Sequence, residues 1–250
     1  MFYRLKVSLW KQRLIQAILR RISVRKFSGD LRTDLIKQNV PGKSFVDVGC
    51  MWGIHGHYCF EAEKHGASRS IGVDIYPPSD EFLETKNEQN STVEFIQGDI
   101  NEDELCEKIG KVDIVLSTGV LYHMPNPIQY LVSIQNICRE KLILGTMVVP
   151  EMNKLSNGAV FYPFLPEKDR KLWNLNIGSQ RSITSPYDAK DGYGNWFWGL
   201  TPSCVEALLR CAGFQVTERY IGGSNAMFLC DATDRPIETS SGPWTNPLNQ

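Results

Sequence analysis

Five short apolar runs between residues 44 and 149 constrain the fold of this chain most strongly. The runs cover residues 44–48, 70–75, 93–96, 112–117 and 141–149. Helix-like stretches separate most of them, around residues 54–65, 79–89 and 127–138. Short buried strands that alternate with helices need crossover connections, and these build a parallel sheet covered on both faces. The sequence therefore predicts an α/β fold.

The C-terminal part of the chain follows a different pattern. Thr201-Pro202 predicts the start of a helix, because Thr is a good N-cap residue and Pro fits the first helical position. This helix should run to Cys211 and stop at Gly213. Two strands near 214–221 and 225–230 should then pair as an antiparallel hairpin, because only a short Gly-Gly-Ser segment separates them.

The net charge of -1 hides a marked asymmetry along the chain. Residues 1–30 hold eight Lys and Arg but one acid, which gives +7, and the remaining residues carry −8. The chain has 250 residues, of which 42% are hydrophobic and 22% charged, so it can bury a large core. A neutral or acidic body disfavours a dedicated nucleic-acid binder. The basic segment is the one part of the chain that could still contact RNA.

The basic N-terminal segment also has an apolar face. Apolar residues recur at three- and four-residue spacings: Leu5, Leu9, Leu14, Ile15, Ile18, Leu19 and Ile22. This spacing predicts an amphipathic helix, followed by a short helix from Leu31 to Gln38. Residues 1–40 are thus predicted to be a basic helical extension. It could serve as a lid over a ligand cleft, as a homodimer contact, or as an anchor to anionic membrane or RNA, and the lid is favoured.

Cysteine usage and hydropathy predict a cytoplasmic protein. The seven cysteines include no C-x-x-C pair, which argues against a zinc or disulfide framework and favours reduced thiols. No apolar run reaches the roughly 18 residues of a membrane span. Charges recur every few residues near the N-terminus, so a secretion signal is not predicted.

Glycine and acidic residues gather where the predicted strands end. Asp47-Val-Gly-Cys-Met-Trp-Gly53 joins the first strand to the following helix, in a D-x-G-x-x-x-G pattern. Asp74 and Asp99 end or follow the second and third strands, and Gly-Val-Leu-Tyr-His at 119–123 follows the fourth. The carboxyl ends of parallel strands meet at one edge of the sheet, which is where such folds bind ligands. These residues therefore predict a nucleotide-type site.

This order of motifs resembles the class I S-adenosylmethionine (SAM)-dependent methyltransferases, over residues 40–149 and more loosely over 196–230. The resemblance implies a seven-stranded, mostly parallel Rossmann-like sheet with a C-terminal antiparallel hairpin and helices on both faces. It implies SAM as cofactor, with Asp74 on the ribose hydroxyls and Asp99 near the adenine. The full set of expected cofactor-binding residues is Asp47, Gly49, Gly53, His55, Asp74, Ile75, Asp99, Ile100, Gly119 and Tyr122.

A weaker resemblance links the chain to the tRNA wobble-uridine carboxymethyltransferases, which use carboxy-SAM. The shared features are Asp-Val-Gly-Cys, Gly-Val-Leu-Tyr-His and a helix that ends in Cys211-Ala-Gly-Phe214. However, the stretch after His123 is Met-Pro-Asn-Pro, where that family is basic, and its late arginine has no counterpart here. Ordinary methyl transfer to a small molecule is therefore favoured, and a tRNA-modifying enzyme is the alternative.

His123 is the candidate catalytic residue. It follows the fourth strand near the expected sulfonium, and its ordinary pKa suits a general base for an oxygen nucleophile. Alternatively, it only fixes the turn or packs against the cofactor. His55 and His57 form an H-x-H pair, but no carboxylate accompanies them nearby, so no metal is predicted.

Residues 150–198 interrupt the strand–helix pattern and are rich in aromatic residues. We expect them to form a substrate cap inserted in a methyltransferase domain of residues 41–230, followed by a loose tail over 231–250. The expected substrate-binding residues are Tyr162, Tyr193, Trp196 and Trp198. A satellite core under a long loop is the other interpretation of these aromatics. The predicted function is small-molecule methylation in biosynthesis.

Overall fold

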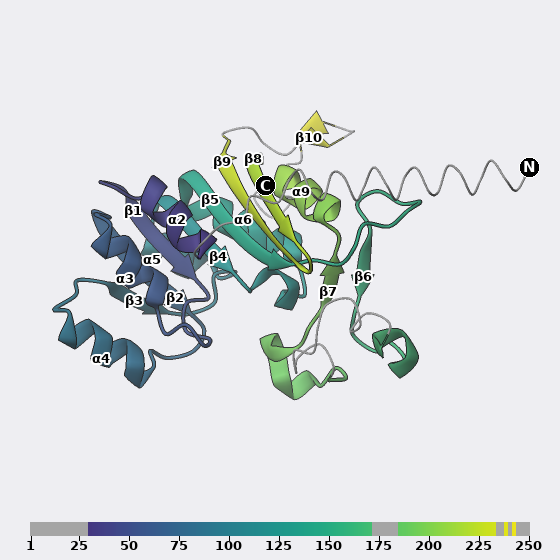
Figure 1. Ribbon diagram of the computed structural model, residues 1–250, viewed down its shortest axis with the longest axis horizontal. Coiled ribbons are helices and arrows are strands. Elements are labelled where there is room, and N and C mark those ends of the chain that lie inside the picture. The colour runs from purple at the N-terminus through teal and green to yellow at the C-terminus, as the bar shows by residue number, and fades with distance from the viewer. Residues whose placement is uncertain (1–29, 172–184, 234–237, 240–241, 244–250) are drawn as a thin grey trace, which may run out of the picture.

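The computed structural model of the protein describes residues 30–171, 185–233, 238–239 and 242–243 (Figure 1). The predicted amphipathic helix at 2–22 and most of the predicted tail fall outside these residues. Within the described residues, no helix is both long enough and apolar enough to cross a membrane.

A seven-stranded sheet forms the centre of the fold, in the order β3-β2-β1-β4-β5-β9-β8. Its strands are β1 Ser44–Val48, β2 Arg69–Asp74, β3 Glu94–Gln97, β4 Val112–Thr118, β5 Cys138–Met147, β8 Phe214–Gly222 and β9 Asn225–Ala232. The first five strands pair in parallel, while β9 runs antiparallel to both β5 and β8. This arrangement confirms the predicted mostly parallel sheet with a C-terminal antiparallel hairpin.

Helices connect the strands, and four of the six begin at a polar side chain that caps them. They are α2 Leu31–Asn39, α3 His57–Lys64, α4 Asp80–Glu88, α5 Asp103–Ile109, α6 Pro127–Ile137 and α9 Pro202–Cys211. The Thr201 hydroxyl accepts a hydrogen bond from the backbone N–H of Cys204 at the start of α9, as the sequence predicted. Helix α5 was not predicted, because its seven residues bury only Leu105 and Ile109 and show little apolar periodicity.

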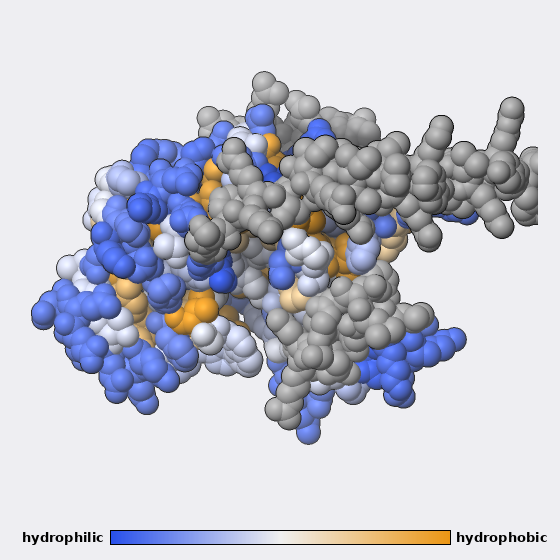
Figure 2. All heavy atoms as spheres, viewed as in Figure 1, coloured by the Kyte–Doolittle hydropathy of each residue, from blue (hydrophilic) through white to orange (hydrophobic). Residues whose placement is uncertain are grey.

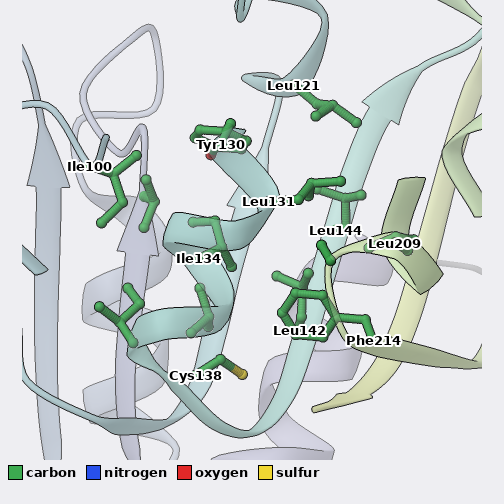
Figure 3. Close-up of a cluster of buried hydrophobic side chains, with 14 of the residues drawn as sticks. Ile100, Leu121, Tyr130, Leu131, Ile134, Cys138, Leu142, Leu144, Leu209 and Phe214 are labelled. Atoms are coloured by element: carbon green, nitrogen blue, oxygen red, sulfur yellow. The ribbon is translucent and has the colours of Figure 1, made fainter. Parts of the chain in front are cut away.

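Alternate residues of the central strands supply two hydrophobic cores, one on each face of the sheet. Phe45 packs with Leu35 and Ile36 of α2 in one buried cluster. Its neighbour Val46 points to the opposite face and packs in the larger cluster with α5, α6 and α9. Figure 3 shows this second cluster, in which Leu131 of α6 lies among side chains of the sheet and α9. Burial on both faces explains why the strands are continuous apolar runs.

The described residues between β5 and α9 lie beyond the carboxyl edge of the sheet (Figure 1). Their strands β6 Ala159–Phe161 and β7 Trp198–Leu200 pair antiparallel. The chain between them includes a 3-10 helix, η2 Ala189–Gly194. A second 3-10 turn, η1 Leu121–His123, follows β4 and contacts β7. We call residues 150–198 the cap. The short strands β10 Glu238–Thr239 and β11 Gly242–Pro243 pair with each other near the C-terminus.

Candidate functional site

A tight turn after β1 leaves no space for a side chain at Gly49. The residue has φ +85°, and a Cβ placed on it would lie 2.3 Å from Cγ2 of Val120 in the turn after β4. Its N–H donates to the carbonyl of Val73 at 2.8 Å, which ties the turn to β2. Gly53 also has positive φ, but a Cβ there would meet nothing within 4 Å. The missing side chain at Gly49 thus lets the turn after β1 pack closely against Val120. Gly53 contributes only a backbone conformation with positive φ.

Asp74 closes two turns with one carboxylate. Its Oδ2 accepts the N–H of Met51 at 2.7 Å, and its Oδ1 accepts the N–H of Tyr76 at 3.0 Å. The residue is 6% exposed, so these bonds compensate for much of the cost of burying the group. Carboxylate oxygens can accept further bonds, which leaves Asp74 able to bind ligand hydroxyls.

Asp99 joins the cap to the sheet and its covering helices, which we call the core domain. Its Oδ1 accepts hydrogen bonds from the backbone and side-chain nitrogens of Asn101, at 2.9 and 2.8 Å. Its Oδ2 accepts the hydroxyl of Tyr193 in the cap at 2.6 Å. Burial, followed by this hydrogen bond, raises the pKa of Tyr193 to about 12. Tyr193 is therefore a neutral donor at physiological pH.

His123 is held in one tautomer by the cap. Its Nδ1 lies 2.8 Å from the carbonyl oxygen of Asn195, and a carbonyl oxygen can only accept. Nδ1 therefore carries the proton in the neutral ring, and Nε2 is the basic nitrogen. Burial lowers the pKa of His123, and the bond to Asn195 partly opposes this shift. The ring is thus mainly neutral at pH 7.

Aromatic contacts connect the turn after β4 to the cap. The ring of Tyr122 stacks on Trp196 with centroids 4.3 Å apart. The carbonyl of Tyr122 accepts the N–H of Phe197 at 2.9 Å. The indole N–H of Trp198 donates to the carbonyl of Pro125 at 3.1 Å. These bonds fix the cap against the residues that follow β4.

The turns after β1, β2, β3 and β4 surround a cavity of about 570 Å³, within the usual range of ligand pockets. Figure 2 shows hydrophilic side chains over the outer helices α3 and α4, and apolar residues gathered nearer the centre of the same face. The cavity lining includes nine of the residues expected to form the site: Gly49, Asp74, Ile75, Asp99, Ile100, Gly119, Tyr122, His123 and Tyr193.

Six expected site residues do not line this cavity: Asp47, Gly53, His55, Tyr162, Trp196 and Trp198. His55 has its Nδ1 2.9 Å from the hydroxyl of Ser79, the residue that caps α4. Tyr162 and Trp196 lie in a buried cluster that also contains Tyr122. Trp198 packs on Phe161 with ring centroids 5.0 Å apart. Their expected roles toward cofactor or substrate remain predictions.

Asp47 is a buried carboxyl group without a hydrogen-bond partner. It is 0% exposed, and neither of its oxygens has a partner among the described residues. Burial, and then the nearby charge of Asp74, raises the pKa of Asp47 to about 8. Asp47 is therefore mainly protonated at neutral pH, and it does not line the cavity.

The cavity lining also includes residues that the sequence did not identify. Trp52 and Tyr76 lie at its edge with their ring centroids 6.0 Å apart, and they are 77% and 43% exposed. Trp52 lies inside the motif from Asp47 to Gly53, so its position in the sequence could have identified it as a site residue. Arg32 in the first turn of α2 also lines the cavity, although it lies outside every motif. Among the described residues, no group of three His, Cys, Asp or Glu is placed to hold a metal ion.

The strand order, the glycine turn after β1 and the acids after β2 and β3 define a nucleotide-binding α/β domain of the methyltransferase type. Residues 46–144 match the family model described as "Methyltransferase domain". This match confirms the resemblance to SAM-dependent methyltransferases that the sequence predicted.

Curated relatives of the chain include tRNA U34 carboxymethyltransferases. The protein from Helicobacter pylori (strain G27) is 27% identical over 132 residues, which are 50% of this chain and 49% of that protein. The protein from Cellvibrio japonicus (strain Ueda107) is 31% identical over 114 residues, which are 42% of this chain and 32% of that protein. The chain thus spans at most about half the length of these relatives.

Solved structures share the fold over a larger part of the chain. The N-terminal domain of EvdMO1 with SAH bound has a TM-score of 0.56 and 15% identity, and the match covers 83% of this chain and 82% of that one. The 1,6-didemethyltoxoflavin-N1-methyltransferase of Burkholderia thailandensis has a TM-score of 0.54 and 16% identity. That match covers 89% of this chain and 90% of the other. Both confirm the fold.

Proposed function

We propose that the protein transfers a methyl group from SAM to an oxygen atom of a small-molecule acceptor, with His123 as general base. The observation that carries this proposal is the hydrogen bond from Nδ1 of His123 to the carbonyl of Asn195. It fixes Nε2 as the proton acceptor in a residue that lines the cavity. A base is needed where the acceptor hydroxyl must lose its proton during transfer.

The residues around the cavity fit SAM. Asp74 lines the cavity and keeps lone pairs that can accept the ribose hydroxyls, and Gly49 presents backbone without a side chain to the same cavity. Asp99 and Ile100 line the part of the cavity that follows β3, where we place the adenine. When bound, SAM supplies the electrophilic methyl group on a sulfonium.

In this proposal the chain's own residues orient the acceptor and remove its proton. The cap holds the His123 ring through Asn195, and Tyr122 is fixed by its stacking on Trp196. A base held beside the reacting hydroxyl lowers the entropic cost of proton transfer, because the two groups are already oriented when the acceptor binds. The lowered pKa of His123 keeps Nε2 unprotonated at neutral pH.

The small-molecule class of acceptor is supported by the cavity itself. Tyr193 and Gly194 of the cap line it together with the turns of the core domain, and Tyr193 bonds to Asp99. Two cap residues thus form part of the cavity wall, and an enclosed cavity of this kind favours a compact acceptor. The 1,6-didemethyltoxoflavin-N1-methyltransferase with a similar fold was solved with bound 1,6-didemethyltoxoflavin and S-adenosylhomocysteine.

Two measurements test the proposal. Calorimetry with S-adenosylhomocysteine should show binding by the folded protein, and its absence would overturn the cofactor assignment. Turnover on a panel of hydroxylated aromatic acceptors, followed as S-adenosylhomocysteine release, should fall about 100-fold or more in His123→Ala. His57→Ala is the matched control, because His57 is exposed and does not line the cavity. Equal turnover in His123→Ala and the wild type would remove the base role.

A second candidate function is tRNA modification, favoured by the similarity to tRNA U34 carboxymethyltransferases. The +7 charge of residues 1–30 would then contact phosphates. This function predicts tRNA binding whose affinity falls steeply with salt concentration. Filter binding at 50 and 200 mM salt tests it, and absent or salt-insensitive binding rejects it.

A further inference from the structure

Arg32 is the only Arg or Lys among the described residues that line the cavity. The same cavity is lined by two acids, Asp74 and Asp99. A cavity with one cation and two acids can bind a ligand that carries a negative group at one point and polar or positive groups at another. Arg32 also lies outside residues 46–144, the segment that matches the methyltransferase family model.

Local contacts fix the guanidinium group of Arg32. Asp30 caps α2 by accepting the backbone N–H of Arg32 at 3.2 Å, and the same oxygen accepts its side-chain Nε at 2.9 Å. The other oxygen of Asp30 accepts the hydroxyl of Tyr58 at 2.6 Å. The guanidinium carbon then lies 4.8 Å from the centroid of the Tyr58 ring, in a cation–π contact.

These contacts use only one edge of the guanidinium. No hydrogen bond joins either of its two terminal nitrogens to another described residue, and the side chain is 38% exposed. Asp30 and Tyr58 thus form a preorganised support that leaves a two-nitrogen donor edge without a partner among the described residues. This edge matches a carboxylate, which accepts two parallel hydrogen bonds from arginine.

The electrostatic effects of Arg32 reach the base of the cofactor turn. Its positive charge opposes the upward shift in the pKa of Asp47, the buried acid of β1. Asp47 comes two residues before Gly49, so the charge of Arg32 acts near the turn after β1.

We propose that Arg32 is a binding residue for a carboxylate group in the cavity, held in place by Asp30 and Tyr58. The inference rests on the proposed function, because a bound methyl donor brings such a group in its amino-acid part. A carboxylate on the acceptor is the other source of the same chemistry. In either case Arg32 selects the charge of the ligand, and the acids bind hydroxyl and amino groups.

Calorimetry on Arg32→Met tests this proposal with two probes that differ in the amino-acid part. S-adenosylhomocysteine carries the carboxylate, whereas 5′-methylthioadenosine lacks it. Loss of a charge-assisted, two-bond contact should weaken binding of the first about 10- to 100-fold and leave the second unchanged. Arg32→Lys should keep part of the affinity, because it retains the charge but loses the two-nitrogen edge.

Arg219→Met is the matched control, because Arg219 is exposed on β8 and pairs with Glu206 away from the cavity. Thermal unfolding of each variant separates loss of binding from loss of folding. If S-adenosylhomocysteine affinity is unchanged, benzoate binding to the protein saturated with S-adenosylhomocysteine tests the acceptor arm. A loss there assigns Arg32 to an acceptor carboxylate.

Two negative results have different meanings. If the wild type does not bind S-adenosylhomocysteine, the proposed function fails. If the wild type binds it, but Arg32→Met changes the affinity for neither S-adenosylhomocysteine nor benzoate, the proposed function stands and the role of Arg32 is overturned.

Discussion

The cofactor turns and the cap are built by different kinds of contact. Asp74 holds the turns after β1 and β2 through backbone N–H groups that local glycine and strand geometry present to it. The cap is held instead by side chains far apart in the sequence, such as Tyr193 on Asp99 and Asn195 on His123. The comparison teaches that the turns after β1 and β2 are held by contacts between neighbouring strands, while the orientation of His123 depends on a residue 72 positions away in the sequence.

The largest effect is expected at Gly49, where the cofactor half should tolerate no side chain. Gly49→Ala places a Cβ 2.3 Å from Val120 Cγ2 at positive φ, so the turn must shift. We expect S-adenosylhomocysteine affinity to fall about 100-fold or more, measured by calorimetry. Gly53→Ala has positive φ but open space, and should lose only about 1 kcal/mol of stability. Similar binding losses in both variants would show that backbone strain, not space, governs the turn.

The next effect concerns Asp47 and the pH dependence of unfolding. Its pKa of about 8 in the folded protein lies well above its value of about 3.9 in an unfolded chain. Between these values the folded state holds a proton that the unfolded state has released, so stability falls as pH rises from about 4 to about 8. Asp47→Asn should remove this decline, measured as the free energy of unfolding in urea at several pH values. An unchanged slope would contradict the assignment.

A smaller effect is expected where the cap meets the core domain. Tyr193→Phe removes the hydroxyl that bonds to Asp99 but keeps the ring. We expect a loss of about 1 kcal/mol in local stability, seen as faster amide hydrogen exchange in residues 188–195. Tyr187→Phe is the control, because Tyr187 makes ring contacts with Phe164 and Phe197 in the same cap. Equal exchange in both variants would mean that the Asp99 contact does not fasten the cap.

The smallest effect is the titration of His123 itself. Burial lowers its pKa below the ordinary value of 6.5, so the neutral form is favoured in the folded state. The preference for the neutral ring contributes to folding stability fully above pH 6.5. This contribution is lost as the pH falls from 6.5 through the lower pKa of His123 in the folded protein. The ring signals of His123 in NMR spectra should titrate below pH 6.5, the ordinary value of a histidine in an unfolded peptide. A pKa at or above 6.5 would show that the cap does not bury the ring.

The sequence predicted the core domain better than the cap for a physical reason. Strand ends, glycine turns and the Thr201 cap of α9 depend on neighbouring residues, so their pattern is visible in the chain. The positions of Trp196 and Tyr162 depend on how the cap folds back on Tyr122, which no local pattern records. Arg32 was missed because its site forms only when α2 packs beside α3 and brings Tyr58 to Asp30.

The pairing of β6 with β7 has a consequence for how such a protein can change over evolution. Phe161 lies opposite Trp198, so the polypeptide leaves and re-enters the domain at adjacent points. A segment with adjacent ends can be lengthened, shortened or replaced without moving the strands around it. Acceptor preference could then diverge among descendants of this chain while the donor-binding turns stay the same, provided that a replacement still offers a carbonyl to His123.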